Sequence, residues 1–317
     1  MEYKNYKYVV ACCTYVAYAI WSAKNLEYLK GHKHNYEGGY ISDKLNIDRL
    51  RDSALHKMVK QNKFIDDALI AVEQQTPNYC HFLTNVLPQV IKIWNEHRPK
   101  TIILSDITDY SLEFFNLLGI KSEIVSIRNT SIYVENAYAR YKYPNKDKKY
   151  IEHKELASIS PIFDKYKVKQ SDMPEKIFIE RKASSNGSTK RRIEPVEETH
   201  RIAEEKGYKL IYLEDLNIES KIKLFFNAKK IATVHGAGLG NIIFCDKNCE
   251  IIEARNTLGM PEIFIDLAKE LKLENYHPIE LESNTTEEEA KELKKSTGNN
   301  SNNVLPMKLS KEFIDAL

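Results

Sequence analysis

The second half of the sequence alternates short apolar runs with amphipathic segments, and this alternation constrains the fold more than any other feature. The runs that we expect to be strands are Ile177–Ile179, Tyr208–Leu213, Lys230–Val234 and Glu250–Glu253. Apolar residues at helical spacing separate them. Strands that alternate with helices in this way are typical of βαβ units, whose strands are parallel. We therefore predict an α/β domain with a parallel sheet.

Proline, asparagine and glycine mark the helix ends in this half. Pro195 suits a first helical position, and Gly207 suits a helix stop. Asn217 is a suitable N-cap for a second helix, and Pro261 begins a third. The last residues, Leu305–Leu317, regain apolar spacing, so we expect a strand and a short helix there.

The first half has the same kind of pattern with less regularity. The expected strands are Asp67–Val72, Thr101–Ser105 and Glu123–Ile127, with helical apolar spacing at 83–94 and 112–118. The N-terminal run Tyr8–Ala23 is too short for a confident membrane span, which needs roughly 20 apolar residues. We expect it to be a core strand or helix.

The length of the chain, 317 residues, exceeds what one hydrophobic core usually serves. We expect two domains, residues 1–165 and 166–317, and allow the C-terminal segment to pack back on the N-terminal domain. The lysine-rich and tyrosine-rich stretch Ala139–Glu155 is expected to be a solvated connection. The polar segment Ser283–Asn303 is expected to be an exposed loop.

Charge and cysteine content exclude some classes of protein. Lys+Arg (47) nearly balances Asp+Glu (45), so no global field favours nucleic acid or a membrane. Five cysteines are few and odd in number, which does not make a disulfide framework and suits a reducing compartment. Without a signal peptide or a convincing transmembrane helix, we expect a cytoplasmic protein, of bacterial or viral origin given its high Lys and Asn content. The sequence does not indicate the oligomeric state.

The stretch VHGAGLGN, Val234–Asn241, is the strongest candidate for a ligand site. Glycines at 236, 238 and 240 let the backbone approach a ligand closely, and a helix start after them presents N–H groups to an anion. His235, at the carboxyl end of a strand, can donate to a phosphate oxygen. A dinucleotide fingerprint, G-x-G-x-x-G, would have its third glycine at position 241, where this sequence has Asn241. This spacing disfavours a nicotinamide-dependent enzyme. The alternative is a tight turn with a packed histidine.

Other charged residues of this half fit an anionic ligand. Glu253, at the end of the next expected strand, can accept hydrogen bonds from ribose hydroxyls. Arginines in a flexible loop after a strand can clamp a diphosphate bidentately. The basic residues of that loop are Arg181, Lys182, Lys190, Arg191 and Arg192. The alternative is a surface glutamate and a solvated basic loop.

In the first half, His81 and Asn85 lie four residues apart at the start of an apolar helix, so they share one face. A histidine there is a reasonable general base, although a structural histidine is the more common outcome. Cys245 and Cys249 lack the second ligand pair of a zinc site. No Asp-x-Asp occurs, so the usual carboxylate pair for a metal on a nucleotide-sugar diphosphate is missing. We expect no metal.

Three segments together resemble glycosyltransferase family 61 in order and spacing. NYCHFLTNVLP (78–88) is similar to the family's N-Y-x-H-W-L-x-D/E-x-L-P helix, and FIERKASSNGSTKRRIEPVEE (178–198) to its strand and Arg-Arg segment. The block from Leu213 to Glu253, which contains HGAGLGN, resembles the family's most diagnostic region.

The resemblance implies a fold of the GT-B type, in which two Rossmann-like domains face each other across a cleft. It implies an inverting transfer of a sugar, such as xylose or N-acetylglucosamine, from a UDP-sugar to a glycan or glycoconjugate, with no metal and no other cofactor. Gly236, Ala237, Gly238 and Leu239 would then hold the diphosphate, with Arg181 and Arg192 beside it, and Glu253 would take the ribose. Arg191, His235 and Asn241 complete the expected donor-binding set.

The sequence departs from the family pattern near the chemistry. The Asp or Glu of the first helix is Asn85 here, and asparagine cannot accept a proton. His81 is therefore our candidate for the catalytic base. A protein that binds a nucleotide sugar or a glycan without catalysis is an alternative hypothesis. Nucleic-acid binding through the basic segment 139–154 is another, and it would require steeply salt-dependent affinity.

Overall fold

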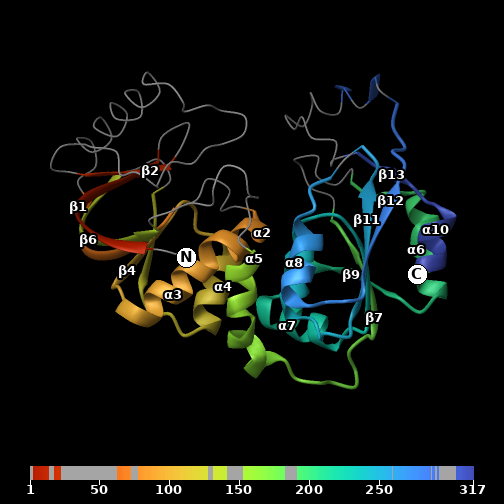
Figure 1. Ribbon diagram of the computed structural model, residues 1–317, viewed down its shortest axis with the longest axis horizontal. Helices are drawn as coiled ribbons and strands as arrows, with labels where there is room; N and C mark the ends of the chain where they lie inside the picture. The colour runs from red at the N-terminus through yellow and green to blue at the C-terminus, as the bar shows by residue number, and fades with distance from the viewer. Residues whose placement is uncertain are drawn as a thin grey trace. The chain divides into compact units, whose positions relative to one another are not determined.

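The computed structural model describes two compact units, Met1–Ile159 and Ser160–Leu317 (Figure 1). The division falls between helix α5 (His153–Ile159) and a 3₁₀ helix, Ser160–Tyr166, whereas we placed it after residue 165. The residues that the structure describes are 3–13, 18–22, 63–72, 78–127, 131–140, 153–182, 191–258, 260–286, 288–289, 291–292 and 305–317. Most of the expected exposed loop and of the expected connection lies outside these residues.

The second unit contains a sheet in which every neighbouring pair of strands is parallel. Its strand order is β12-β11-β10-β7-β9. The strands are β7 (Lys176–Glu180), β9 (Lys209–Tyr212), β10 (Lys230–Val234), β11 (Glu250–Asn256) and β12 (Tyr276–Leu281). The first strand, β7, lies between the second and the third, so the direction of winding reverses between β7 and β10. This is the topological switch point of a doubly wound sheet, where ligands of α/β proteins bind.

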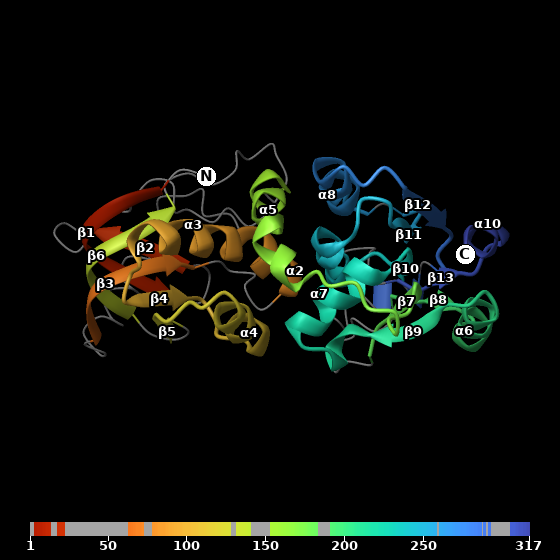
Figure 2. The ribbon, with the colours of Figure 1, turned by 90° about the horizontal axis from the view of Figure 1, so that it is seen from below.

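Helices cover both faces of this sheet. Figures 1 and 2 show α6 and α10 on one side and α7 and α8 on the other. The four helices are α6 (Val196–Glu205), α7 (Ile218–Asn227), α8 (Ile263–Leu271) and α10 (Lys311–Ala316). Because both faces are covered, the central strands β7 and β10 are apolar and buried over most of their length, which explains why they appear in the sequence as continuous apolar runs.

The helix ends follow the local signals in the sequence. The Asn217 side chain caps α7 by accepting from the Ser220 N–H, as we predicted. Pro195 occupies the N-cap position of α6, and Gly207 follows that helix with φ +83°, a conformation that glycine adopts without strain. Helix α8 begins two residues after Pro261.

The C-terminal segment forms the strand and short helix that its apolar spacing predicts. Strand β13 (Met307–Lys308) pairs with β8 (Ile193–Glu194), and α10 follows it. Phe313 and Leu317 join the hydrophobic core that contains Phe178 of β7. The segment therefore packs within its own unit, whereas the sequence analysis allowed it to pack on the N-terminal domain.

The first unit contains a mixed sheet with the order β2-β1-β6-β3-β4-β5. Its strands are β1 (Tyr3–Cys13), β2 (Tyr18–Ser22), β3 (Lys63–Ala71), β4 (Thr101–Leu104), β5 (Glu123–Ser126) and β6 (Ser131–Arg140). Strands β6, β3, β4 and β5 are parallel, and β1 and β2 extend the sheet in antiparallel fashion. The chain is thus an α/β protein with parallel sheets, consistent with a Rossmann-like fold, and the expected N-terminal core element is a pair of strands.

The apolar helix that we expected around Leu83–Trp94 consists of three consecutive helical segments. They are α2 (Tyr79–His81), a π-helix (Phe82–Val86) and α3 (Leu87–His97), and α3 packs against β3 and α5 (His153–Ile159). Helix α4 (Asp109–Leu117) ends before Gly119, as predicted. None of the helices in the described ranges is long and apolar enough to cross a membrane.

Candidate functional site

The switch point of the second unit brings two of the predicted segments together. Arg181 directly follows Glu180, the last residue of β7, and His235 and Gly236 directly follow Val234, the last residue of β10. Strands β7 and β10 are paired and parallel, so these residues leave the sheet at the same edge. The predicted donor loop therefore lies at the edge of the sheet where ligands bind in this fold.

Gly236 lies beside two arginine side chains, and its backbone angles do not themselves require a glycine. Its φ of 166° and ψ of 177° are extended values that any residue adopts. A Cβ atom at this position would lie 3.4 Å from Nη1 of Arg181 and 3.4 Å from Nη1 of Arg191. The missing side chain thus leaves room beside two neighbouring guanidinium groups.

The two guanidinium groups are not neutralised by the part of the chain that the structure describes. Arg191 donates from Nη1 to the main-chain carbonyl of His235 at 2.6 Å. Nε of Arg191 and Nη1 of Arg181 are buried and have no hydrogen-bond partner among those residues. Buried N–H groups are almost always paired, so two orphans at one place indicate a site for a missing acceptor.

The pKa values of the two arginines also indicate a site for an anion. Burial lowers the pKa of Arg181, and the attraction of Glu214 and Glu180 opposes this effect. Burial and the neighbouring Arg181 lower the pKa of Arg191 to about 9, with Glu253 acting in the opposite direction. Burial therefore makes the charged form of both arginines less stable than it is in water. An anion bound between the two guanidinium groups would stabilise their charged forms.

The 3₁₀ helix Ala237–Phe244 supplies main-chain donors beside the arginines. Its first N–H groups, those of Ala237 and Gly238, have no acceptor within the helix. Leu239 donates its N–H to the Gly236 carbonyl, and the buried Asn241 side chain donates to the Gly238 carbonyl at 2.8 Å. These bonds keep the turn tight, so the free N–H groups stay fixed at the helix start.

Glu253 lies inside the sheet and not at its edge. We expected the strand to end at Glu253, but β11 continues to Asn256, and this boundary was wrong. The Glu253 side chain is 0% exposed. Its Oε1 lies 2.5 Å from Nδ1 of His235, and its Oε2 accepts from the Tyr276 hydroxyl at 2.9 Å and from Arg255 Nη1 at 3.2 Å. Both carboxylate oxygens are therefore occupied by protein groups.

His235 is almost as deeply buried, and its ring packs against Phe264 of α8 at 5.1 Å between centroids. Burial lowers the pKa of the imidazole. Glu253 opposes this effect, while Arg191 and Arg255 add to it. His235 is therefore neutral at neutral pH.

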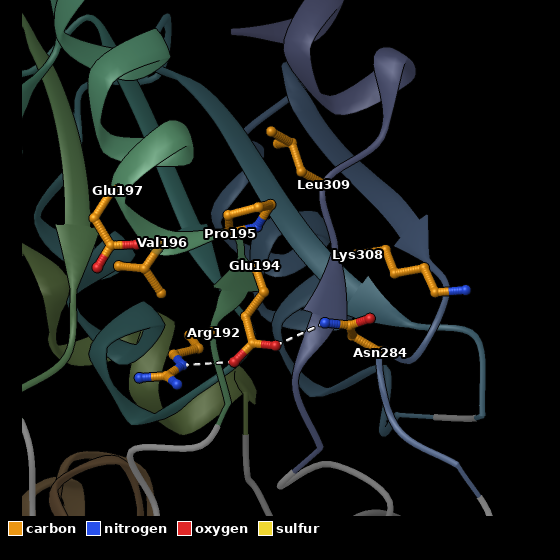
Figure 3. A pocket seen from close by; sticks show the side chains of 8 residues that line it. All are labelled: Arg192, Glu194, Pro195, Val196, Glu197, Asn284, Lys308 and Leu309. Carbon is orange, nitrogen blue, oxygen red and sulfur yellow. Dashed lines mark hydrogen bonds and ion pairs between the residues drawn. The ribbon is translucent and has the colours of Figure 1, made fainter.

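The remaining basic residues lie elsewhere. Arg192 is 48% exposed and pairs with Glu194 at 2.9 Å. It lines a pocket of about 590 Å³ that includes no residue of the 234–241 loop (Figure 3). Lys182 pairs with Asp215, and Lys190 lies outside the described residues. Arg191, and not Arg192, thus accompanies Arg181 beside Gly236.

In the first unit, His81 and Asn85 lie on one helical face as their spacing predicted. Asn85 Nδ2 is 3.5 Å from His81 Nδ1, a long contact, and Asn85 Oδ1 is buried with no partner in the described part of the chain. The two positions span the junction of α2 and the π-helix, a kind of segment often found at functional sites. Their catalytic role stays a prediction.

Sequence reasoning missed Arg255 and Tyr276, which complete the hydrogen bonds of Glu253. A signal for Arg255 was present, because Glu253 and Arg255 are two residues apart in a strand and so point to the same face. A carboxylate and a guanidinium side by side in an apolar strand indicate a buried ion pair. Tyr276 lies on the adjacent strand and gave no such signal.

A doubly wound parallel sheet is typical of α/β proteins that bind phosphate-containing ligands when arginine N–H groups and a helix start meet at its switch point. Here the described residues leave one N–H-bearing nitrogen of each arginine without a partner. The chain belongs to glycosyltransferase family 61: the family model described as Glycosyltransferase 61 matches residues 79–252, which is more than half of the chain. This range contains both His81 and the 234–241 loop. No curated protein matches the chain. Family membership supports glycosyltransferase activity, with a sugar donor and a glycan acceptor as partners.

Proposed function

We propose that the protein is an inverting glycosyltransferase that moves a sugar, of the xylose or N-acetylglucosamine type, from a UDP-sugar to a hydroxyl group of a glycan or glycoconjugate. One observation carries the proposal: two neighbouring guanidinium groups with orphan N–H donors flank Gly236 at the switch point of a parallel sheet. Within family 61, a nucleotide diphosphate is the anion that best fits this place.

The chemistry of the donor set supports a diphosphate as ligand. Arginine presents several N–H donors in a plane and binds phosphate oxygens bidentately. The free N–H groups of Ala237 and Gly238 add main-chain donors at a helix start. In the reaction the bond between the anomeric carbon and the diphosphate oxygen breaks, and negative charge grows on that oxygen. Fixed cationic and N–H donors stabilise this charge, so we propose that no metal ion is required.

We also propose that the chain belongs to the GT-B class of these enzymes. The support is that each of the two units has its own sheet with helices, wholly parallel in the second unit and parallel over β6, β3, β4 and β5 in the first. The second unit has the doubly wound order of a nucleotide-binding domain, which agrees with the donor site described above.

For the acceptor, we propose that His81 removes the proton of the attacking hydroxyl. The hydroxyl oxygen then forms a bond to the anomeric carbon on the side opposite the leaving diphosphate, which inverts the configuration there. A neutral imidazole can take a proton near neutral pH, whereas Asn85 cannot. Asn85 lies beside the His81 ring and can fix its orientation.

Thermal shift and nucleotide release test the proposal together. The purified protein is incubated with UDP-, GDP- and CMP-sugars in EDTA and, separately, in Mn²⁺. We expect the melting temperature to rise with the UDP compounds in both conditions, and slow release of UDP. The variant Arg191→Lys should lose the shift, and the matched control Arg201→Lys, whose side chain pairs with Glu205 on exposed helix α6, should keep it. No shift with any nucleotide would refute the proposal.

A second candidate function is binding without turnover. The observation that favours it is Asn85, which stands where the family pattern has an acidic residue. A thermal shift with a UDP-sugar but no UDP release, even after acceptor glycans are supplied, would identify this function.

A further inference from the structure

The buried carboxylate of Glu253 controls the protonation of His235. Its Oε2 lies 3.2 Å from Arg255 Nη1, and a guanidinium is charged at any ordinary pH, so the paired carboxylate is ionised. An ionised carboxylate only accepts hydrogen bonds. The 2.5 Å contact between Glu253 Oε1 and His235 Nδ1 therefore requires the proton to be on Nδ1.

This proton position determines what the other ring nitrogen can do. A neutral imidazole carries one proton, so Nε2 of His235 has a lone pair and accepts hydrogen bonds. A second proton is disfavoured by the surroundings, because Arg191 bonds the His235 carbonyl, Arg255 bonds the same carboxylate, and Phe264 packs on the ring. Among the described residues the His235 side chain makes its hydrogen bond through Nδ1, and Nε2, which keeps some access to solvent, makes none.

We propose that Glu253 is a positioning residue that holds His235 with Nε2 as an acceptor, and that this nitrogen accepts a hydrogen bond from a hydroxyl group next to the diphosphate of the bound nucleotide sugar. The inference rests on the function proposed above. A lone pair repels the oxygens of a phosphate, so Nε2 requires a hydrogen-bond donor of the ligand, and we assign it a hydroxyl because of its place next to the diphosphate. Both the ribose and the transferred sugar carry hydroxyls adjacent to the diphosphate.

This role differs from the expectations for both residues. The sequence analysis gave His235 a phosphate oxygen as partner, and it gave Glu253 a ribose hydroxyl. In the proposed arrangement Glu253 does not touch the ligand, since both of its oxygens already bind His235, Tyr276 and Arg255. It acts on the ligand through the imidazole.

Two substitutions of His235 test the roles of its two ring nitrogens separately. His235→Asn places an amide N–H where Nδ1–H is, so it keeps a donor for Glu253 and removes Nε2. His235→Gln places its amide group near the position of Nε2 and loses the bond to Glu253. We expect His235→Asn, which keeps the bond to Glu253, to lower the melting temperature of the free protein less than His235→Gln does. It should bind the ligand about tenfold more weakly, the size of one lost hydrogen bond. His235→Gln should melt at a lower temperature but recover part of the affinity.

UDP, its 2′-deoxy and 3′-deoxy analogues and a UDP-sugar identify the hydroxyl in these variants. If Nε2 binds a ribose hydroxyl, His235→Asn lowers the affinity for UDP. The deoxy analogue that lacks this hydroxyl then has the same affinity for the wild-type protein and for the variant. If Nε2 binds the transferred sugar, His235→Asn weakens the UDP-sugar and leaves UDP unchanged. Both results support the inference. Equal affinity of wild type and His235→Asn for UDP and for the UDP-sugar would overturn it.

Nitrogen NMR of ¹⁵N-histidine-labelled protein tests the proton position without any ligand. The signals of His235 are those that disappear in the His235→Asn spectrum. We expect Nδ1 to be protonated and Nε2 to be unprotonated at neutral pH, and a proton on Nε2 would overturn the inference. If no UDP compound binds the wild-type protein, the proposed function fails, and the NMR result still decides the protonation of His235.

Discussion

Arg191 donates from Nη1 to the main-chain carbonyl of His235 at 2.6 Å, which ties the segment before β8 to the end of β10. A guanidinium has five N–H donors, and this bond uses one of them. The bond fixes the direction of the side chain, while Nε stays buried without a partner in the described part of the chain. Arg191 is thus oriented by the protein and left unsatisfied at the place where we propose that the diphosphate binds.

Arg181→Lys and Arg191→Lys should each weaken UDP binding by at least about tenfold, because an ammonium group cannot give the planar pair of hydrogen bonds and one charge-assisted bond alone is of that size. Isothermal titration calorimetry measures the affinity. The melting temperature of free Arg181→Lys should not fall by more than that of Arg201→Lys, since Arg181 has no carboxylate within ion-pair distance among the described residues. Arg191→Lys also loses the bond to the His235 carbonyl, so its melting temperature should fall further. Unchanged affinity in both variants would contradict the proposed site.

Two of the three glycines of the 234–241 loop, Gly236 and Gly238, should respond differently to substitution by alanine. In Gly236→Ala the methyl group would lie 3.4 Å from both guanidinium groups, in the proposed ligand space, and the extended backbone accepts alanine. We expect UDP binding to be lost with little change in melting temperature. In Gly238→Ala the methyl group would lie 2.9 Å from Cδ1 of the buried Leu213, so we expect a stability loss of about 1–3 kcal/mol from overpacking.

Urea unfolding and UDP titration of both glycine variants check this contrast. The site is contradicted if Gly236→Ala binds UDP like wild type. The packing argument is contradicted if Gly238→Ala is as stable as wild type, because Leu213 would then have moved without cost.

The doubly wound half of the fold could be predicted because its signals are local. Strands covered on both faces are apolar throughout, and the end signals Asn217 and Gly207 act within a few residues. Strand β6 was missed because its apolar residues Ile132, Val134, Ala137 and Ala139 are interrupted by polar ones and its partners, β1 and β3, are distant in sequence. Pairing over such distances has no local signature.

The candidate site was predictable in its position but not in its contacts. The glycine loop marks the carboxyl edge of a strand, and the sheet order then makes that edge a switch point. Which of Arg191 and Arg192 faces the loop depends on the alternation of side chains at the start of β8, and spacing alone did not reveal it. The contacts of Glu253 could not be predicted because strand β11 continues three residues beyond Glu253. Arg255, the partner of Glu253 in a buried ion pair, lies in this continuation, where the apolar pattern has ended.

His81 should be needed for turnover and not for donor binding. We expect His81→Ala to lower the rate of sugar transfer by about 10²–10⁴-fold, the usual contribution of a general base, with UDP affinity within about twofold of wild type. Stopped assays of UDP release with acceptor, together with UDP titration, measure the two quantities. Asn85→Ala is the companion variant and should reduce the rate less, since it changes only the orientation of the imidazole. A fully active His81→Ala protein would remove His81 as the base.

The buried imidazole of His235 should make the protein less stable in mild acid. Its pKa in the folded protein is lowered from the ordinary value of 6.5, mainly by burial. Below pH 6.5 the unfolded chain therefore takes up a proton at this residue while the folded protein does not. As a result, the free energy of unfolding decreases as the pH is lowered. The stability is fully present above pH 6.5 and is lost as the pH falls toward the folded value, at up to about 1.4 kcal/mol per pH unit.

Urea unfolding of wild type and His235→Asn between pH 7.5 and 5.5 isolates this effect, because the other eight histidines of the chain are common to both proteins. The difference in unfolding free energy should be constant above pH 6.5 and should shift in favour of the variant below it, since asparagine takes up no proton. A difference that stays constant over the whole range would mean that His235 titrates alike in the folded and unfolded chain. A shift in favour of wild type would mean that Glu253 raises the pKa of the imidazole by more than burial and the two arginines lower it, and His235 would then be charged when it meets the ligand.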